Sequence, residues 1–211
     1  EGDPLKAQLS EQIEFLRAWD LRWGVESVAT SLAIFATEAL NPLARDAAQE
    51  AGIPMNEFLT TAAAAPILLE ALAAGSSRLE EDFGRWQTPW GEINRFQRLT
   101  GDIVQPFNDD EPSIPVGFTS SRYGSLASFG ARRYPGTVRF YGTSGNSFVA
   151  VVEFGDSVRA KAVTAGGLNR DPNSPHYNDQ AERYATGDLR EVYFYPNQLE
   201  GHIEREYHPG G

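Results

Sequence analysis

The spacing of hydrophobic residues changes near residue 85, and this change limits what the chain can fold into. Before that point the apolar positions recur every three or four residues, as they do along one face of a helix. The first such stripe consists of Leu5, Leu9, Ile13 and Leu16. Beyond that point short apolar runs alternate with loops rich in Gly, Pro, Ser and Asp, which is typical of strands. Helices first and strands second predict an α+β fold, with a mainly helical segment at 1–85 and a strand-rich segment at 86–211.

Capping residues and prolines predict where the helices begin and end. Asp3 followed by Pro4 is typical of a helix start, so the first helix should begin there. The second apolar stripe should stop at Pro42, because proline lacks the amide hydrogen that a helix interior needs. The third helical region should be broken or kinked at Pro66 and should end at the Gly-Ser-Ser run 75–77.

Two strands are expected between residues 134 and 154, around a turn at 142–145. The run 148–154 is apolar nearly throughout, which predicts a strand covered on both faces. Residues 158–163 alternate in polarity and predict a more exposed strand. The stretch 101–133, rich in Gly, Pro, Ser and Asp, should form long ordered loops.

The run 164–180 predicts a strand end, a loop and a helix start. A flexible Gly166-Gly167 pair leads into Ser174 and Pro175, which are suited to the N-cap and the first turn of a helix. Ser174, Asp179 and Gln180 are suitable acceptors for the first amide groups of that helix, and Asp179 would also favour the positive end of its dipole. We therefore expect side-chain-to-backbone hydrogen bonds here, with His176 packed against neighbouring strands.

Composition excludes several classes of function. A net charge of −11 argues against nonspecific binding to nucleic acid or to anionic membranes, because both need basic surface. The longest apolar stretch, near 62–69, is far too short to span a bilayer, and the first residues do not resemble a signal peptide. The absence of cysteine rules out disulfides and thiolate chemistry.

The three histidines, His176, His202 and His208, are the first candidates for nucleophilic catalysis. A triad would need one of them beside a nucleophile and an orienting acid. The sequence offers no G-x-S-x-G elbow, since the run around Ser144 resembles one only superficially. Surface or capping roles are therefore expected for all three histidines, and we assign no catalytic residue.

Metal and phosphate sites are not indicated either. His202 and His208 are six residues apart, which does not place them on one helical face as in a zinc pair. The acidic run 108–111 lacks the spacing of a calcium loop and predicts a solvated loop. Gly166-Gly167 is not followed by the Gly-Lys-Ser/Thr of a phosphate loop. We expect no metal and no cofactor.

Four tryptophans raise the question of an aromatic pocket for an acyl group. Trp19 and Trp23 are four residues apart on an expected helix and would share a face. Trp86 and Trp90 flank Pro89 at an expected strand entry. Aromatic residues at such positions are more often part of a core than of a ligand site, so a core role is expected.

Several motifs together resemble one known family. The Gly-Gly…Ser-Pro-His-Tyr-Asn-Asp-Gln run at 166–180 is similar to a segment near the C-terminus of the penicillin acylase family, which includes acyl-homoserine-lactone acylases and aculeacin-type lipopeptide acylases. Further segments resemble the strand before that loop, the closing strand and helix, and upstream landmarks of the same subunit: 140–155, 193–202, 207–209, 86–98 and 16–20. The resemblance covers nearly the whole chain and implies the C-terminal part of the large (β) subunit.

The resemblance implies a segment of the αββα fold of N-terminal-nucleophile hydrolases. In that family a serine freed at the N-terminus of the large subunit is the nucleophile, its α-amino group is the base, and a downstream Asn with a backbone N–H forms the oxyanion hole. This chain begins with Glu1, and its first serine, Ser10, is not terminal. No residue matches a catalytic position, so we expect the catalytic parts on other portions of the enzyme and no amidase activity from this chain alone.

The implied reaction is hydrolysis of the amide bond of N-acylated substrates. Among these the resemblance favours acyl-homoserine lactones, whose cleavage is quorum quenching, or lipopeptides over penicillins. It also implies a periplasmic or secreted enzyme. The expected partners are the small subunit, the N-terminal part of the large subunit and the small-molecule substrate. The alternative is a free-standing binding or interaction module without catalysis.

Overall fold

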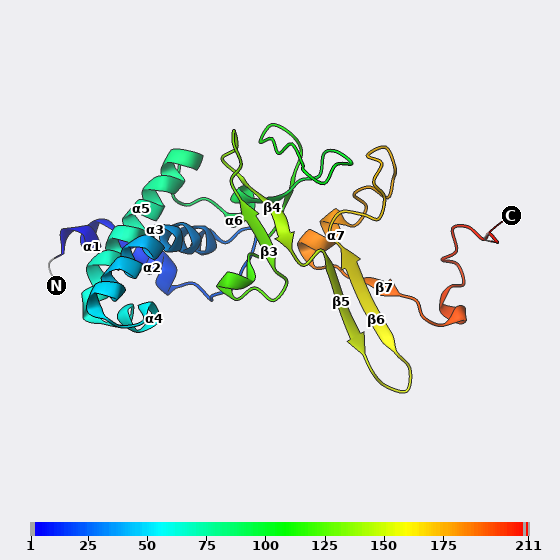
Figure 1. The fold of residues 1–211 in the computed structure, drawn as a ribbon, viewed down its shortest axis with the longest axis horizontal. Coiled ribbons are helices and arrows are strands. Elements are labelled where there is room, and N and C mark those ends of the chain that lie inside the picture. Colours follow the sequence, from blue (N-terminus) through cyan, green and yellow to red (C-terminus); the bar gives the residue numbers. More distant parts are fainter. Residues whose placement is uncertain (1–2, 209, 211) are drawn as a thin grey trace.

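A computed structural model describes residues 3–208 and 210, in which helices precede two small sheets (Figure 1). The helical elements up to residue 83 are α1 Pro4–Gln8, α2 Ser10–Arg17, α3 Val28–Ala51, α4 Met55–Phe58, the 3₁₀ turn η1 Ala62–Ala64 and α5 Ala65–Phe83. Asp3 caps α1 as predicted, because its carboxylate accepts from the N–H of Leu5 at 2.9 Å. This mixture of helices and sheets agrees with the α+β class, and the division into two segments at residue 85 remains a prediction.

The two long helices, α3 and α5, pack side by side, and both continue through predicted stops. Pro42 lies inside α3, so the predicted end there is wrong. Residues 75–77 lie inside α5, where a Cβ added at Gly75 would come within 2.5 Å of the backbone nitrogen of Ala36. The glycine therefore permits a close helix–helix contact instead of ending the helix. Pro66 does not break a helix either, because it occupies the first turn of α5.

The larger core joins these helices to the first sheet. Its fully buried members include Leu32, Leu79, Trp90 and Ile93, and Phe140 stacks on Phe35 with ring centroids 5.6 Å apart. The predicted core roles of Trp86 and Trp90 are confirmed, although Trp90 begins the short helix α6 (Trp90–Ile93) just before the first strand. Trp19 and Trp23 lie beyond the end of α2 and meet edge to face at 5.7 Å, so the helix predicted for them is wrong.

The first sheet has the strand order β2-β1-β4-β3. Its strands are β1 Asn94–Phe96, β2 Ile114–Pro115, β3 Phe129–Arg132 and β4 Phe140–Gly145. β1 and β4 are parallel, and the other two pairings are antiparallel. Residues 142–145 belong to β4, so the turn predicted there is wrong. The prediction of long loops over 101–133 holds only in part, because β2 and β3 lie inside that stretch. The residues between these strands do form loops, with the 3₁₀ turn η2 (Ser121–Tyr123) among them.

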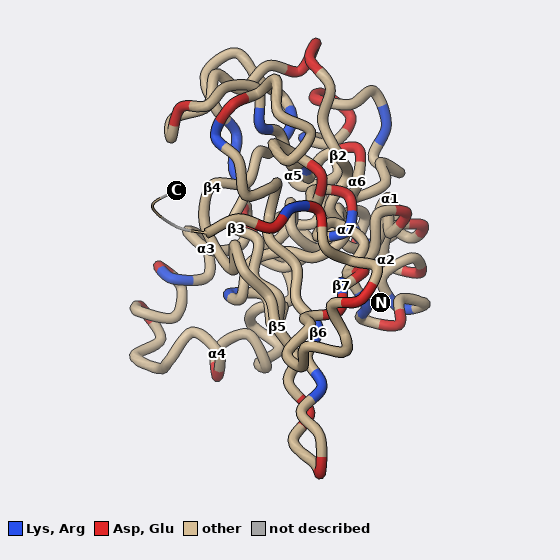
Figure 2. The backbone as a smooth tube through the Cα atoms, turned by 90° about the vertical axis from the view of Figure 1, so that its right-hand side faces the viewer, with Lys and Arg blue, Asp and Glu red and all other residues tan. Residues whose placement is uncertain are grey.

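The second sheet is an antiparallel hairpin with a short third strand. Its strands are β5 Phe148–Glu153, β6 Arg159–Thr164 and β7 Arg190–Val192, in the order β5-β6-β7. The prediction that 148–154 is covered on both faces is wrong, because Phe148 is 60% exposed and Val151 63% exposed. The prediction for 158–163 holds only in part, since Arg159 and Lys161 are exposed while Val163 is buried. The hairpin projects from the body of the molecule (Figures 1 and 2).

A second, smaller core joins the two sheets through α7 (Ala181–Thr186). It consists of Val116, Phe129, Val163, Tyr184 and Ala185. Beyond β7 the chain forms one more 3₁₀ turn, η3 (Pro196–Gln198), and then runs away from the body (Figure 1). Acidic and basic residues are both scattered along the backbone (Figure 2). Within the described residues, no helix combines the length and hydropathy needed to cross a bilayer.

Candidate functional site

Two of the sequence motifs, 86–98 and 166–180, meet in space at Arg98. The guanidinium of Arg98 donates to the backbone carbonyls of Tyr177 (2.5 Å) and Asn169 (3.0 Å) and lies 4.1 Å from the centre of the Tyr177 ring. In return, the side-chain amide of Asn178 donates to the carbonyl of Arg98 at 3.2 Å. Arg98 therefore acts as a clamp on the loop before α7. The only sequence signal for this role is the position of Arg98 at the end of the 86–98 motif.

The glycine pair lets this loop close on itself. Gly166 has a φ of +87°, a conformation that favours glycine. A Cβ added at Gly167 would lie 2.2 Å from the carbonyl oxygen of His176, so only glycine fits there. The closed loop is held by backbone bonds from Asn169 to His176 (3.1 Å) and from Gln180 to Gly166 (2.8 Å).

The predicted helix start at Ser174 and Pro175 is wrong. Residues 171–180 form turns, and α7 begins at Ala181 with Gln180 as a cap residue that makes no side-chain capping bond. Turns form here instead of a helix because the carbonyl of His176 accepts from the N–H of Asn169 and lies against Gly167. It therefore does not accept from an N–H one helical turn further along the chain. Side-chain-to-backbone bonds do hold the junction, as predicted: Ser174 accepts from His176 N–H at 3.2 Å, and Gln180 accepts from Thr164 N–H at 3.1 Å.

His176 is exposed, so its predicted packing against strands is also wrong. Its Nδ1 lies 3.1 Å from a carboxylate oxygen of Asp179, and its Nε2 lies 3.7 Å from Glu204. The hydrogen bond to Asp179, with the charge of Glu204 as a second cause, raises the pKa of the imidazole above its usual value. Asp179 thus binds a side chain instead of a helix terminus.

The other histidines are not placed for catalysis. His202 stacks on Tyr193 with ring centroids 4.5 Å apart and shares a hydrogen bond with its hydroxyl at 3.1 Å. His208 is exposed in the tail. Over residues 3–208, no histidine ring is hydrogen-bonded to a serine or threonine hydroxyl. Ser144 donates weakly to the carbonyl of Gly130 at 3.5 Å, within the first sheet. These residues do not form a hydrolytic triad.

The acidic run 108–111 is tied to the first sheet. One carboxylate oxygen of Asp109 accepts from the Tyr141 hydroxyl at 2.8 Å, and the other accepts from Val138 N–H at 2.6 Å. Burial, followed by the hydrogen bond to Asp109, raises the pKa of Tyr141 to about 12. The prediction of a solvated loop therefore fails for Asp109. In the part of the chain that the structure describes, no group of three or more His, Asp or Glu side chains could hold a metal ion.

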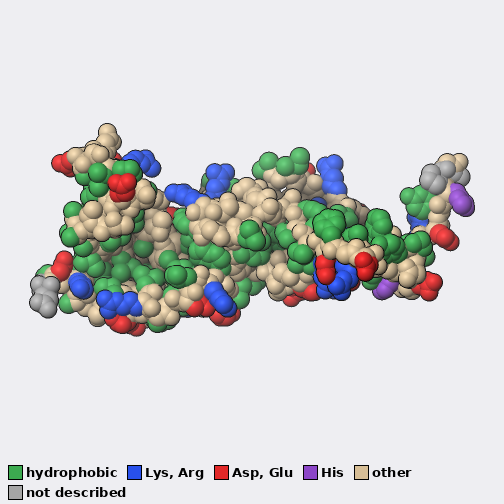
Figure 3. Space-filling model, turned by 90° about the horizontal axis from the view of Figure 1, so that it is seen from below, with side chains coloured by type: hydrophobic (Ala, Val, Ile, Leu, Met, Phe, Trp, Pro, Cys, Tyr) green, Lys and Arg blue, Asp and Glu red, His purple; other side chains and the backbone are tan. Residues whose placement is uncertain are grey.

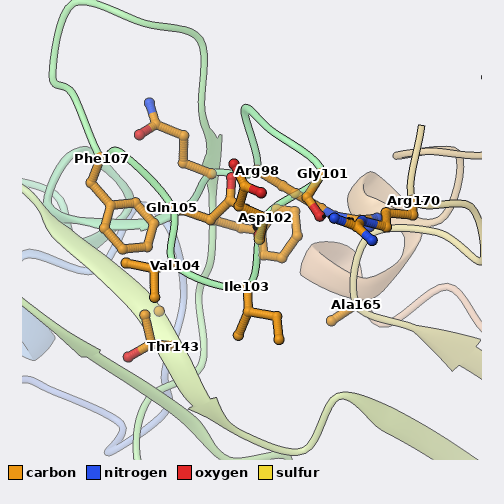
Figure 4. Close-up of a pocket in the computed structure, with 13 residues that line it drawn as sticks. Arg98, Gly101, Asp102, Ile103, Val104, Gln105, Phe107, Thr143, Ala165 and Arg170 are labelled. Carbon is orange, nitrogen blue, oxygen red and sulfur yellow. Dashed lines mark hydrogen bonds between the residues drawn. The ribbon is translucent and has the colours of Figure 1, made fainter. Parts of the chain in front are cut away.

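A cavity of about 810 Å³ lies beside the clamp, between the loop 101–105 and β4 (Figure 4). Its walls are mainly apolar and include Phe96, Ile103, Val104, Phe107 and Ala165. Two cations line it, but Arg98 is bound to carbonyls and Arg170 donates to the carbonyl of Gly101 at 3.0 Å. Asp102 and Thr143 also line the cavity. The Asp102 carboxylate accepts from the Thr100 hydroxyl at 3.4 Å, and the Thr143 hydroxyl shares a hydrogen bond with that of Tyr134 at 2.9 Å. The cavity therefore offers mainly apolar contact surface.

Most of the chain matches a protein-family model. The family model described as penicillin amidase matches residues 3–201. The match begins before α1, includes both sheets and α7, and contains both motifs that meet at Arg98.

Proposed function

This chain belongs to the penicillin amidase family, whose members are hydrolytic amidases, and from that membership we propose that it is a structural portion of an N-terminal-serine acylase. The match over residues 3–201 carries the proposal. The described side chains add support, because they hold the motifs together without forming a catalytic group.

The proposed reaction is hydrolysis of the amide bond of an N-acylated substrate. The serine oxygen attacks the amide carbonyl while its proton passes to the α-amino base, and the amine leaves with that proton. Water then attacks the acyl-enzyme ester and releases the carboxylic acid. The serine and its oxyanion donors would lie on other portions of the acylase, and this chain would complete the sheets that support them.

We further propose acyl-homoserine lactones or lipopeptides as substrates, in preference to penicillins, and a periplasmic or secreted location. Both proposals rest on the overall resemblance of the chain to the acylase family.

The free-standing module is the weaker alternative, because this chain exposes too much apolar surface. Large hydrophobic side chains are open to solvent in the loop beside the cavity, on the hairpin and along the tail: Ile103, Val104, Phe148, Phe154, Phe194, Ile203 and Tyr207. Figure 3 shows hydrophobic side chains at the surface on one side of the molecule. Exposed apolar side chains at three such places support a portion of a larger assembly, because exposed apolar surface is a common mark of an interaction site.

A substrate panel on the full-length protein that contains this chain tests the proposal. Acyl-homoserine lactones of several chain lengths, a lipopeptide and a penicillin are incubated with it, and the released amine is quantified. Amine release from the first two classes supports the proposal. Release from penicillin alone would overturn the substrate preference, and no release from any of them would overturn the acylase assignment.

A further inference from the structure

His176 stands on a backbone that is fixed by hydrogen bonds, while its ring is open to water. Its N–H donates to the hydroxyl of Ser174 at 3.2 Å, and its carbonyl accepts from the N–H of Asn169 at 3.1 Å. The next residue, Tyr177, is buried, and Arg98 binds its carbonyl at 2.5 Å. The side chain of His176 is 50% exposed. The ring is therefore held in place at the surface, where it can exchange protons with water.

Two carboxylates from separate segments face the two ring nitrogens. Nδ1 lies 3.1 Å from Asp179 in the same loop, and Nε2 lies 3.7 Å from Glu204 in the tail beyond β7. The hydrogen bond to Asp179, followed by the charge of Glu204, raises the pKa of the imidazole. The next residue of the tail, Arg205, lies instead over the ring of Tyr207, 5.1 Å from its centre. The charged groups that act on the ring are thus both acidic.

The contact with Asp179 decides which nitrogen carries the hydrogen of a neutral His176 ring. An ionised carboxylate only accepts hydrogen bonds, so Nδ1 must be the donor. A neutral imidazole has a single N–H, and its Nε2 then presents a lone pair to the carboxylate of Glu204. Two acceptors do not attract each other. Protonation adds an N–H at Nε2 and makes the ring a cation, so the contact with Glu204 becomes favourable only then.

The tail depends on this contact beyond residue 202. Up to that point it is held by Tyr193, whose ring stacks on His202 with centroids 4.5 Å apart. Among the described residues 203–208, the pair of Glu204 with His176 is the single hydrogen bond or ion pair to another part of the chain. The tail otherwise runs away from the body (Figure 1). Loss of the pair would leave these residues attached only through His202.

We propose that His176 is a pH-sensitive latch, whose protonated ring fastens the tail through Glu204 and whose neutral ring releases it. Fastening is fully present below the pKa of the free imidazole and is lost as the pH rises through the higher pKa of the fastened state. The tail should therefore be released at pH values above about 6.5. Because both side chains are exposed, the latch shifts a population instead of locking the tail. The latch does not depend on the proposed acylase function.

A spin label in the tail tests the latch. His208→Cys gives one attachment point within these 211 residues, because the sequence contains no cysteine, and any cysteine outside them is replaced. The EPR spectrum of the labelled full-length protein is recorded between about pH 5.5 and 8.5, on both sides of the ordinary histidine pKa. We expect the ratio of fastened to released tail to fall about two- to fivefold over this range, the ordinary size for an exposed ion pair.

Three variants sharpen this test. Glu204→Gln should remove the response to pH, because the amide carries no charge for the imidazolium to attract. Glu206→Gln is the matched control, since it changes the net charge equally at a residue that forms no ion pair within residues 3–208, and it should keep the response. His176→Arg should hold the tail at both ends of the pH range, because a guanidinium stays charged and can bind two carboxylates.

NMR titration of His176 in the same variants separates the latch from a general effect of charge. Glu204→Gln should lower the pKa of the ring, and Glu206→Gln should leave it nearly unchanged. Label mobility that does not change with pH would overturn the proposal. So would a response that survives Glu204→Gln or His176→Arg, or one that is lost in Glu206→Gln.

Discussion

Gly167→Ala should destabilise this protein by removing the space on which the loop before α7 depends. The new Cβ would lie 2.2 Å from the carbonyl oxygen of His176 and 2.7 Å from both the carbonyl oxygen of Tyr177 and a carboxylate oxygen of Asp179. Two of these three atoms belong to the backbone, so a side-chain rotation cannot relieve the contact. The loop would have to open, which strains the Arg98 clamp that bonds to the same carbonyl of Tyr177.

The expected loss is about 1–3 kcal/mol in the free energy of unfolding, as for other overpacked sites. At a site with room, Gly→Ala instead stabilises by about 0.4–1 kcal/mol, because it restricts the unfolded chain. A protein of this size should therefore melt roughly 2–12 °C lower. Urea unfolding followed by tryptophan fluorescence measures the change, provided that the m-value is unchanged.

Gly24→Ala is the matched control, because a Cβ at Gly24 meets nothing within 4 Å. It should leave the urea midpoint unchanged or raise it. If Gly167→Ala matched Gly24→Ala in stability, the reasoning about the closed loop would be refuted.

Three further substitutions or titrations probe other parts of the fold. Gly75→Ala should cost about 1–3 kcal/mol, measured by urea unfolding, because its Cβ would press into the α3 backbone at 2.5 Å. Tyr141→Phe should cost about 1–3 kcal/mol, measured the same way, because it removes a buried hydrogen bond to the carboxylate of Asp109. NMR titration should give His176 a pKa above its usual 6.5, and Asp179→Asn should bring it back towards that value.

The sign of the His176 effect follows from the raised pKa. The stabilising contact with Asp179 is fully present below the unfolded pKa and is lost as the pH rises through the higher folded pKa. The stability difference between the wild type and Asp179→Asn should therefore shrink as the pH rises above 6.5. A difference that grew with pH would contradict this account.

Tyr134→Phe is the control for Tyr141→Phe, because the Tyr134 hydroxyl bonds to Thr143 at an exposed position. It should change stability by less than about 0.5 kcal/mol. Equal losses in the two variants would show that burial of the Asp109 contact is not the cause. For Gly75→Ala, an unchanged urea midpoint would show that α3 and α5 are not in close contact there.

Capping residues and prolines in the sequence predict a helix end correctly where contacts within one helical turn determine it. Asp3 and Pro4 place the start of α1 correctly, because a cap and a proline act within one turn. The predictions at Pro42 and Gly75 are wrong because tertiary packing outweighs single-residue propensity. Beyond Pro42, α3 continues because Ala44 and Ala48 are buried, Ala48 in a cluster with Phe58 and Ala64. Gly75 lies inside α5 because it meets the α3 backbone.

The loop before α7 shows a different limit of sequence reasoning. Ser174 and Pro175 are good helix starters, yet the carbonyls of this loop are taken by Arg98 and Asn169, both of which lie outside the predicted helix. The apolar run 148–154 was read as a covered strand, and the chain described here does not cover it. Its apolar pattern fits a strand that is covered in the proposed acylase.

Labelling of the assembled acylase with a serine-reactive sulfonyl fluoride tests the central claim most directly. Peptide mass mapping then locates the label while residual amidase activity is measured on an N-acyl substrate. The account predicts that activity is lost with one label on an N-terminal serine outside these 211 residues, and that no serine of this chain is modified. A stoichiometric label on a serine within this chain, with parallel loss of activity, would contradict it.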